Sequence, residues 1–386
     1  MNKENLNKTN REIVCPDHFG KNKVRKDAFR DQLRKLYLLN GIGNLSIAGA
    51  AWVLLLVTDG YSLIQVGIAE TIFHIVSITM EIPSGMFADI CGRKKSLAVS
   101  CIAGILSGLT RAYTHSFLGV CISIGFSALS YNFWTGTDNA LAYDALSEEG
   151  QEKMYDGYVA RQTVIYRITD GAATLGAGLA VMLGNVKSQL IGVGIGVIRL
   201  MILATMQENK VVTENAKSLR DRFSENVQES ISFLKGNIRA AKLIYRNCLV
   251  GAIDVLLLFF MQAKLPMTGI ADWVLGPLLF VMSMGGVLGA AMSEKVKGLR
   301  FGYLFLGCVS LAFLGFLASF SGRASIMTLG GFAAAFADDL IQIRADVELN
   351  DMIPAPQRAT LISVNSLCFS MVMIVMSPLA GWVFSL

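Results

Sequence analysis

Eleven apolar blocks, each near the length of a membrane-spanning helix, constrain this chain more strongly than any other feature of its sequence. An α-helix rises 1.5 Å per residue, so about 20 apolar residues cross the ~30 Å hydrocarbon layer of a bilayer. Several helical spans fit this pattern better than one globular core. The blocks run from residues 36–57, 62–84, 96–113, 117–143, 157–183, 188–206, 243–264, 268–292, 301–320, 324–349 and 358–384.

The composition agrees with this interpretation. Hydrophobic residues make up 53% of the 386 residues and charged residues only 16%, too few for the charged shell of a soluble domain of this size. Residues 1–35 are polar and basic and lack the apolar region of a cleavable signal peptide. The sequence therefore predicts an all-α polytopic membrane protein.

The sequence offers no pattern typical of metal, nucleotide or catalytic chemistry. Its seven cysteines and three histidines are scattered, without a CxxC or a Cys/His cluster. Cysteines of this kind are usually packing residues, so we expect no metal and no disulfide framework. The GxxxxGK[ST] phosphate loop is absent, so ATP is not the evident energy source. We expect no cofactor, no enzymatic activity and no nucleic-acid partner.

Lys and Arg are distributed unevenly between the two sides of the predicted bundle. We assign 26 of the 34 to one side, which the positive-inside rule identifies as cytoplasmic. The chain then divides into a basic cytoplasmic N-terminal arm at 1–35, six spans at 36–206, a cytoplasmic connector at 207–242 and five spans at 243–386. Apolar residues within the connector recur at helical spacing, which predicts an amphipathic helix at the membrane surface.

The loop between the second and third blocks carries a motif whose residue types each have a mechanical reason. Its sequence is Gly85-Met-Phe-Ala-Asp89-Ile-Cys-Gly92-Arg93-Lys94-Lys95. Gly85 lets two helices approach closely, Asp89 is an anion suited to a helix N-terminus, and Gly92 permits a tight turn. The basic run anchors the loop on the cytoplasmic face and can pair with acids.

This motif resembles the G-x-x-x-D-x-x-G-R-[RK] signature of the major facilitator superfamily, which lies between helices two and three. The resemblance implies a major facilitator fold of two six-helix bundles, with the second bundle one helix short and about 11 transmembrane helices in all. It also implies that Asp89 lies near the start of helix eleven, where Arg358 and the helix dipole hold it as a cytoplasmic latch.

A finer resemblance concerns two further segments. Residues 135–144 and 358–366 are similar to bacterial drug-efflux or tetracycline-resistance-like members of the superfamily. The antiporter signature of helix five is incomplete, because the Gly-Pro that ends its glycine run is missing.

Ionisable residues in hydrocarbon cost ~2.5–3.5 kcal/mol on insertion scales, so they generally face a partner or water. By family resemblance, helices one, four, seven and ten line the central cavity, so acids on helices seven and ten are candidates to carry a proton or bind a cationic substrate. Structural ion pairing is the alternative, and we favour it for Arg167 and Asp170, which share one helix face. The candidate substrate and proton residues are Asp254, Asp338, Asp339, Asp170 and Trp134.

A second group of charges lies toward the cytoplasmic ends of the helices. We interpret these residues as a gate or inter-helix clamp: Asp138, Asp144, Arg161 and Glu81. Arg199 falls on an expected outer helix, and the sequence indicates no role for it.

We therefore expect a proton-coupled exporter of a small, partly apolar compound such as a drug, monomeric and multi-pass in a bacterial inner membrane. It would work by alternating access, with the proton gradient as energy source. One alternative is an importer or uniporter of a small nutrient. Another is a non-transporting or truncated membrane paralogue.

Overall fold

The computed structural model describes residues 17–208, 225, 228, 232, 235–352 and 358–386, with side chains from residue 30 and, in the last range, from residue 364. Every regular element in this described part is helical, which confirms the all-α prediction. The predicted amphipathic helix of the connector lies mostly outside the described residues.

The described N-terminal half comprises ten α-helices and a short 3-10 turn at Glu152–Met154. The helices are α1 (Asp17–Gly43), α2 (Ile47–Ala50), α3 (Trp52–Thr58), α4 (Leu63–Cys91), α5 (Arg93–Tyr113), α6 (Phe117–Trp134), α7 (Thr137–Glu148), α8 (Tyr155–Leu175), α9 (Ala177–Leu183) and α10 (Asn185–Ala204). The C-terminal half comprises α12 (Ile238–Lys264), a 3-10 turn at Pro266–Thr268, α13 (Asp272–Met292), α14 (Phe301–Ala318), α15 (Ala324–Met352) and α16 (Arg358–Ser385).

Nine helical segments of the described chain are long and apolar enough to cross a membrane, counting α6 and α7 as one. The predicted first and fifth spans are not among them. The first is divided among α1, α2 and α3, and the fifth carries several charges along α8 and is interrupted at Gly176 before α9. Exposed Leu and Ile side chains along the helices suit a lipid-facing surface, as at Leu306 and Leu329. The chain is a multi-pass membrane protein.

Two of the helix breaks have a local cause. After Gly43, the Asn44 side-chain amide donates hydrogen bonds to the Asn40 carbonyl and side chain, both at 2.8 Å, and Ser46 then caps α2. Between α6 and α7, Gly136 has φ 77°, a conformation that L-residues other than glycine seldom adopt. Both breaks therefore follow from turn chemistry within the span.

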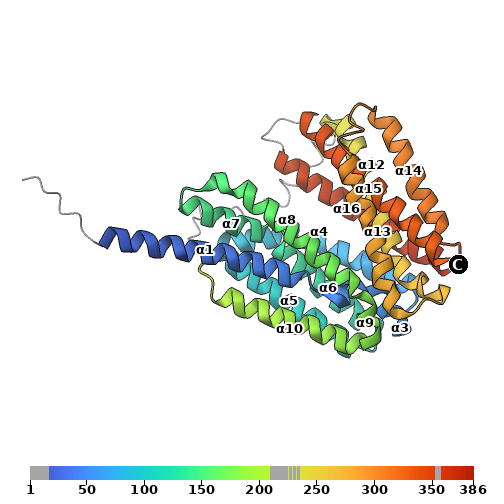
Figure 1. Ribbon diagram of the computed structural model, residues 1–386, viewed down its shortest axis with the longest axis horizontal. Coiled ribbons are helices and arrows are strands. Elements are labelled where there is room, and N and C mark those ends of the chain that lie inside the picture. The colour runs from blue at the N-terminus through green and yellow to red at the C-terminus, as the bar shows by residue number, and fades with distance from the viewer. Residues whose placement is uncertain (1–16, 209–224, 226–227, 229–231, 233–234, 353–357) are drawn as a thin grey trace, which may run out of the picture.

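The two halves meet along three helix pairings. Helix α4 packs against α16, α8 and α9 pack against α13, and α3 packs against α12. Figure 1 shows that the halves lie together near α3, α9 and the C-terminus and diverge toward α7 and the start of α16. We call the side with the Gly92, Glu148 and Ala204 helix ends the connector side, and the opposite side the far side.

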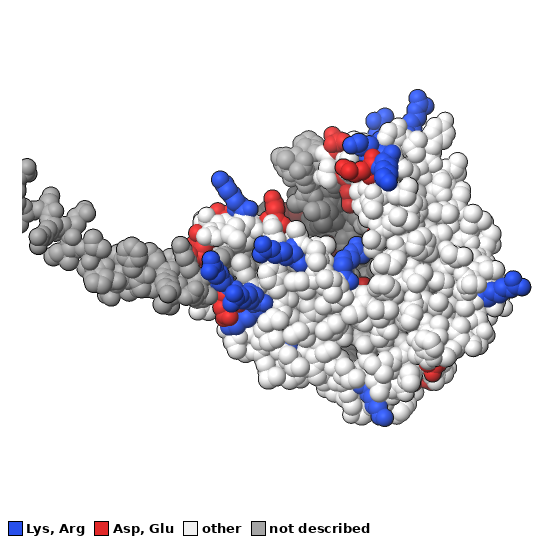
Figure 2. Space-filling view, viewed as in Figure 1, with Lys and Arg blue, Asp and Glu red and all other residues white. Residues whose placement is uncertain are grey.

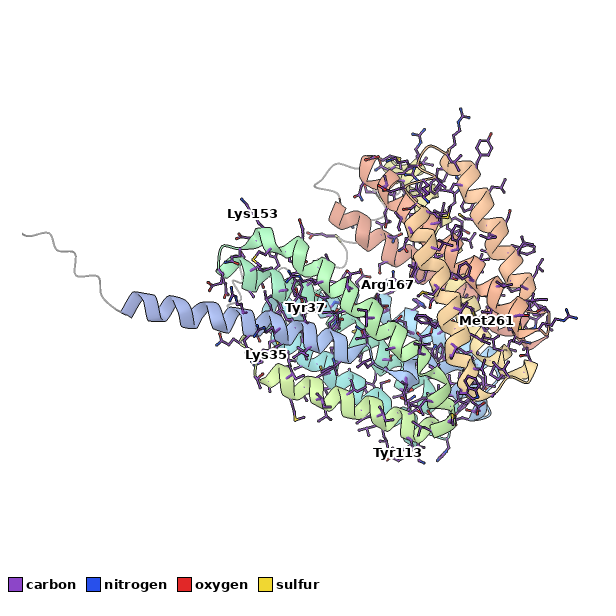
Figure 3. All side chains as sticks on the ribbon, viewed as in Figure 1. Lys35, Tyr37, Tyr113, Lys153, Arg167 and Met261 are labelled. Carbon is purple, nitrogen blue, oxygen red and sulfur yellow. The ribbon has the colours of Figure 1, made fainter. Side chains whose placement is uncertain are left out.

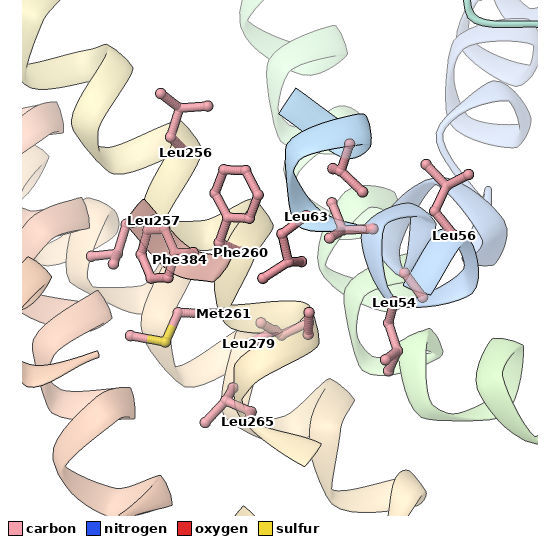
Figure 4. Packing of buried hydrophobic residues seen from close by; sticks show 14 of the residues in the cluster. Leu54, Leu56, Leu63, Leu256, Leu257, Phe260, Met261, Leu265, Leu279 and Phe384 are labelled. Carbon is pink, nitrogen blue, oxygen red and sulfur yellow. The ribbon is translucent and has the colours of Figure 1, made fainter. Parts of the chain in front are cut away.

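The main hydrophobic cluster lies on the far side and spans the two halves. It joins α3 and α4 to α12, α13 and α16, and Leu63 lies beside Phe260 (Figure 4). The Phe260 and Phe384 rings stack with centroids 5.0 Å apart within it. Tight apolar packing therefore closes the far side.

Charged side chains gather at the connector-side ends of both halves, and much of the surface between the two sides is uncharged on the face shown in Figure 2. Lys35 and Lys153 lie at the connector side and Tyr113 at the far side (Figure 3). This arrangement agrees with the positive charge assigned to one side from the sequence.

We expect the connector side to face the cytoplasm. In a cysteine-free background, a membrane-impermeant maleimide added to intact cells should label His115→Cys, which is exposed on the far side, and should leave Lys153→Cys unlabelled until the cells are permeabilised. Labelling of Lys153→Cys in intact cells, with His115→Cys protected, would reverse the orientation.

Candidate functional site

Four glycines let the backbones of the two halves touch on the far side. A Cβ atom at Gly67 on α4 would overlap the backbone of Ser377 on α16, and one at Gly381 on α16 would overlap Leu63 on α4. The contact is reciprocal, because a glycine on each helix lies against the backbone of the other helix. Only glycine permits so close an approach of two helices.

The α9–α13 contact repeats this arrangement. A Cβ atom at Gly178 would overlap the Asp272 backbone, and one at Gly276 would overlap the Leu175 backbone. Counted along the chain, the second predicted span (α4) pairs with the eleventh (α16), and the fifth (α8 and α9) pairs with the eighth (α13). Two equivalent glycine contacts thus close the far side, and we call Gly67, Gly381, Gly178 and Gly276 the glycine seal.

Hydrogen bonds also cross between the halves. The Val53 backbone N–H donates to Gln262 Oε1 at 3.1 Å, and Thr71 Oγ1 donates to the Ile374 carbonyl at 3.2 Å. Deeper along the same interface, His74 Nδ1 lies 3.2 Å from Ser370 Oγ. The interface is therefore polar as well as tightly packed.

His74 also contacts an acid of its own helix. Its Nε2 lies 3.3 Å from Glu70 Oε1, one turn earlier on α4, and both side chains are almost fully buried. Glu70 lines a cavity, whereas His74 contacts α16 of the other half. An ionisable pair thus connects the cavity with the interface that must open if the halves move.

That cavity has a volume of about 510 Å³ and lies within the N-terminal half, among α2, α4, α5, α6 and α10, reaching α12 at Phe259. Its lining is rich in small polar side chains. The serines are Ser46, Ser107, Ser123, Ser127 and Ser130, and the charged residues are Glu70, Arg111 and Arg199. A volume in this range suits a small organic solute.

The predicted acids of the C-terminal half lie close together. Asp338 Oδ1 is 3.2 Å from the position of a Cβ atom on Gly251 of α12, and Asp339 packs against Gly286 of α13. Asp254 lies near enough for the charges of Asp338 and Asp339 to act on its carboxyl group. Helices α12 and α15 thus share a cluster of three acids at membrane depth.

Arg167 relates this cluster to the N-terminal half. It lies on α8 toward the C-terminal half (Figure 3) and attracts both Asp170 on its own helix and Asp339 on α15. The predicted Arg167–Asp170 pairing is thus an electrostatic attraction that Asp339 shares. Trp134, the remaining candidate, lies against the Arg199 guanidinium at the end of α6.

The loop motif joins three helices of the N-terminal half. Arg93 Nε lies 2.6 Å from Asp144 Oδ2 at the end of the fourth span. The Lys94 backbone N–H donates to Glu208 Oε1 at 2.9 Å, and the Lys94 ammonium donates to the carbonyls of Ala204 and Met206. The motif therefore fixes the connector-side ends of α5, α7 and α10 to one another.

Other motif and clamp residues have different surroundings. Gly92, with φ 109°, ends α4 and starts α5. Asp89 is exposed and lies close enough to Asp144 to repel its charge, whereas the Arg358 side chain lies outside the described residues, so the latch stays a prediction. The prediction that Gly85 allows a close helix approach is wrong, because no atom lies within 4 Å of its Cβ position.

The clamp residues do not form one cluster. Asp138 is buried and accepts hydrogen bonds from Gln162 Nε2 at 2.7 Å and Asn40 Nδ2 at 3.4 Å, which joins α7 to α8 and α1. Asp144 contacts Arg93, Arg161 is exposed on α8, and Glu81 is half-buried on α4. Their part in gating stays a prediction.

Sequence reasoning missed His74 and the serine-lined cavity. Glu70 and His74 are four residues apart within an apolar block, a spacing that could have indicated the pair. The cavity serines come from α5, α6 and the N-cap of α2, and no linear pattern connects them.

Comparisons with known proteins agree with this geometry. No protein-family model matches the sequence. A Bacillus subtilis (strain 168) protein described as the uncharacterized MFS-type transporter YxaM is 29% identical over 98 residues, a match that covers 25% of this chain and 23% of that protein. The match thus spans less than a quarter of the relative's length.

Solved structures resemble the whole chain. A mutant form of the nucleoside transporter NupG superposes with a TM-score of 0.72 at 16% identity, over 92% of this chain and 90% of its own. An inward-facing bacterial homolog of the human lysosomal transporter Spinster superposes with a TM-score of 0.69 at 17% identity. The superposition covers 92% of this chain and 81% of that one. The D-xylose-proton symporter superposes with a TM-score of 0.62 at 13% identity, over 92% of this chain and 94% of its own.

These neighbours are transporters of the major facilitator fold, and identities this low establish shared architecture. Two packed helical halves, the loop motif and these superpositions together define the fold class. The chain has the major facilitator fold, as the motif predicted.

Enlarging the glycine seal should favour opening of the far side. Overpacking typically costs ~1–3 kcal/mol, so Gly67→Leu or Gly276→Leu should shift the balance between closed and open far sides by roughly tenfold or more. In a cysteine-free background carrying Ser127→Cys in the cavity, labelling from the far side should accelerate accordingly.

Gly194→Leu is the matched control, because its Cβ position on α10 has no atom within 4 Å. It should leave the labelling rate unchanged. An unchanged rate in both seal variants would show that the glycine contacts do not hold the far side closed.

Proposed function

We propose that this protein is a secondary transporter that works by alternating access. One observation carries the proposal: a polar cavity in the N-terminal half reaches α12 of the other half, and glycine contacts close the two halves on one side while they diverge on the other. Two equivalent interfaces allow the halves to rock about a fixed site. A solute that enters from the connector side would leave by the far side once the seal opens.

Proton-coupled efflux is the transport mode that we favour. The acids on α12 and α15 lie at membrane depth, where a carboxylate is costly unless it is neutralised or paired. The Glu70–His74 pair offers a second protonatable site at the moving interface. The substrate would be a small, partly apolar compound, as the drug-efflux resemblance of 135–144 and 358–366 implies.

Import is the second candidate. Among the structural neighbours, NupG is named a nucleoside transporter and another is named a D-xylose-proton symporter. The same halves and the same acids could serve uptake, because the direction of coupled transport follows from the gradients. A non-transporting paralogue remains a third alternative, which any measured transport would exclude.

The expected cellular setting completes the proposal. We place the protein in a bacterial inner membrane as a monomer, with the 1–35 arm and the 207–242 connector in the cytoplasm and the two bundles at 36–206 and 243–386. Asp89 would latch the connector side when that side closes. The observed Arg93–Asp144 pair would keep the loop in place for this contact.

A susceptibility panel tests the function. An efflux-deficient host that expresses the chain should resist at least one toxic compound more than a host expressing Gly67→Leu at equal membrane abundance. Increased sensitivity to a toxic nutrient analogue would instead indicate import. No change across drug and nutrient-analogue panels would contradict transport of either kind.

Replacing the carboxylates should uncouple transport from protons. In everted vesicles, Asp254→Asn or Asp338→Asn should abolish pH-driven movement of the compound that the panel identifies, because each amide is permanently neutral. Exchange without a pH gradient can survive. Asp156→Asn, exposed at the start of α8, is the control. Full pH-driven transport in both membrane variants would place the proton path elsewhere.

A further inference from the structure

Arg199 lies deep in the N-terminal half, on a helix that the sequence placed outside the central cavity. It is 14 residues from the far-side end of α10 at Asn185, which corresponds to about 21 Å at 1.5 Å per residue. Its guanidinium carbon is 4.0 Å from the centroid of the Trp134 ring, and the guanidinium also packs against the Gly43 backbone at the end of α1. Three helices therefore fix its position.

This cation lacks a direct ionic partner among the described residues. None of their carboxylates lies within 4.0 Å of it, and its Nε is buried without a hydrogen-bond acceptor. Asp138 attracts it from a distance, but that carboxylate accepts hydrogen bonds from Gln162 and Asn40. A largely enclosed guanidinium with a buried, unpaired Nε is costly in this setting, and stacking on an aromatic ring offsets only part of the cost.

Arg199 lines two adjacent cavities. One is the 510 Å³ cavity with five serines, and the other, of about 230 Å³, is lined by Asn40, Asn44, Tyr131 and Trp134. Ser127 and Ser130 belong to both. Hydroxyls can donate hydrogen bonds to a negatively charged oxygen, as the guanidinium can.

The other charges of the larger cavity have partners. Arg111 Nη2 lies 3.1 Å from Asp59 Oδ2, and Glu70 contacts His74. Arg199 is therefore the lining charge without an ion-pair partner in the described part of the chain, and the cavity has a positive centre surrounded by hydroxyls.

We propose that this cavity binds the oxyanion group of a small organic solute, with Arg199 as the charged ligand-binding residue and Ser127 and Ser130 as hydrogen-bond donors. The proposal rests on the transport function and names its substrate class, a solute with a carboxylate or phosphate group. Because Trp134 stacks on the same guanidinium, its fluorescence would change when an anion binds in the cavity.

Tryptophan fluorescence of the purified full-length protein tests this site. Sodium benzoate and sodium phosphate are titrated separately at constant ionic strength, with benzyl alcohol as the neutral analogue of benzoate, and Trp134→Phe assigns the signal. We expect a saturable change with at least one anion and none with benzyl alcohol. Benzoate alone would indicate a carboxylate solute, phosphate alone a phosphorylated one, and both together a general oxyanion site.

Arg199→Gln should weaken the anion response about tenfold or more, since a charge-assisted hydrogen bond contributes ~1.5–3 kcal/mol. Arg246→Gln is the matched control, because that arginine stacks on Phe305 in the other half and does not line the cavity. If Arg199→Gln does not fold, the Ser127→Ala/Ser130→Ala variant should show the same weakening. No saturable anion response, or an undiminished one in the cavity variants, would overturn the site.

The binding assay separates this proposal from the transport proposal. Anion binding that depends on Arg199, in a protein that moves no compound, would leave the site standing and refute transport. Transport restricted to uncharged or cationic compounds, unaffected by Arg199→Gln, would refute the site and leave transport standing.

Discussion

Backbone contact between the halves, made possible by four glycines, is the constraint on which this structure depends. Helices in lipid gain little from burying apolar surface against each other, so close packing and polar contacts must hold them together. The glycine seal supplies that packing at two equivalent places on the far side. With the far side closed in this way, the halves diverge toward the connector side (Figure 1).

Polar groups are divided unequally between the halves. The N-terminal half holds a serine-lined cavity around an arginine, whereas the C-terminal half holds three acids on α12 and α15. Arg167 and His74 lie where the halves face each other, one attracting Asp339 and the other contacting Ser370. Any rocking motion that parts these interfaces must change the surroundings of both residues.

Much of the architecture could be predicted from the sequence because it depends on local pattern. Apolar block length located the nine helical segments of the described chain that can cross a membrane, and the Gly85–Lys95 motif indicated the fold that the superpositions confirm. The helix breaks at Gly43 and Gly176 were not predicted, since they interrupt apolar runs without changing their hydropathy. The seal glycines could not be identified either, because 37 glycines occur and only tertiary placement shows that these four meet a backbone of the other half.

Arg199 shows why the candidate site could be predicted only in part. From the sequence it was a charge on an outer helix, and depth alone could not tell whether an acid would neutralise it. In the structure, Arg199 is surrounded by an indole ring, a glycine backbone and hydroxyl groups. These groups hold the guanidinium in place without neutralising its charge. An arginine kept for structure alone would be stabilised most by a carboxylate close by, and Asp138 is instead hydrogen-bonded to Gln162 and Asn40. The positive charge is thereby left available to the cavity, which is the physical condition for recognising an anion.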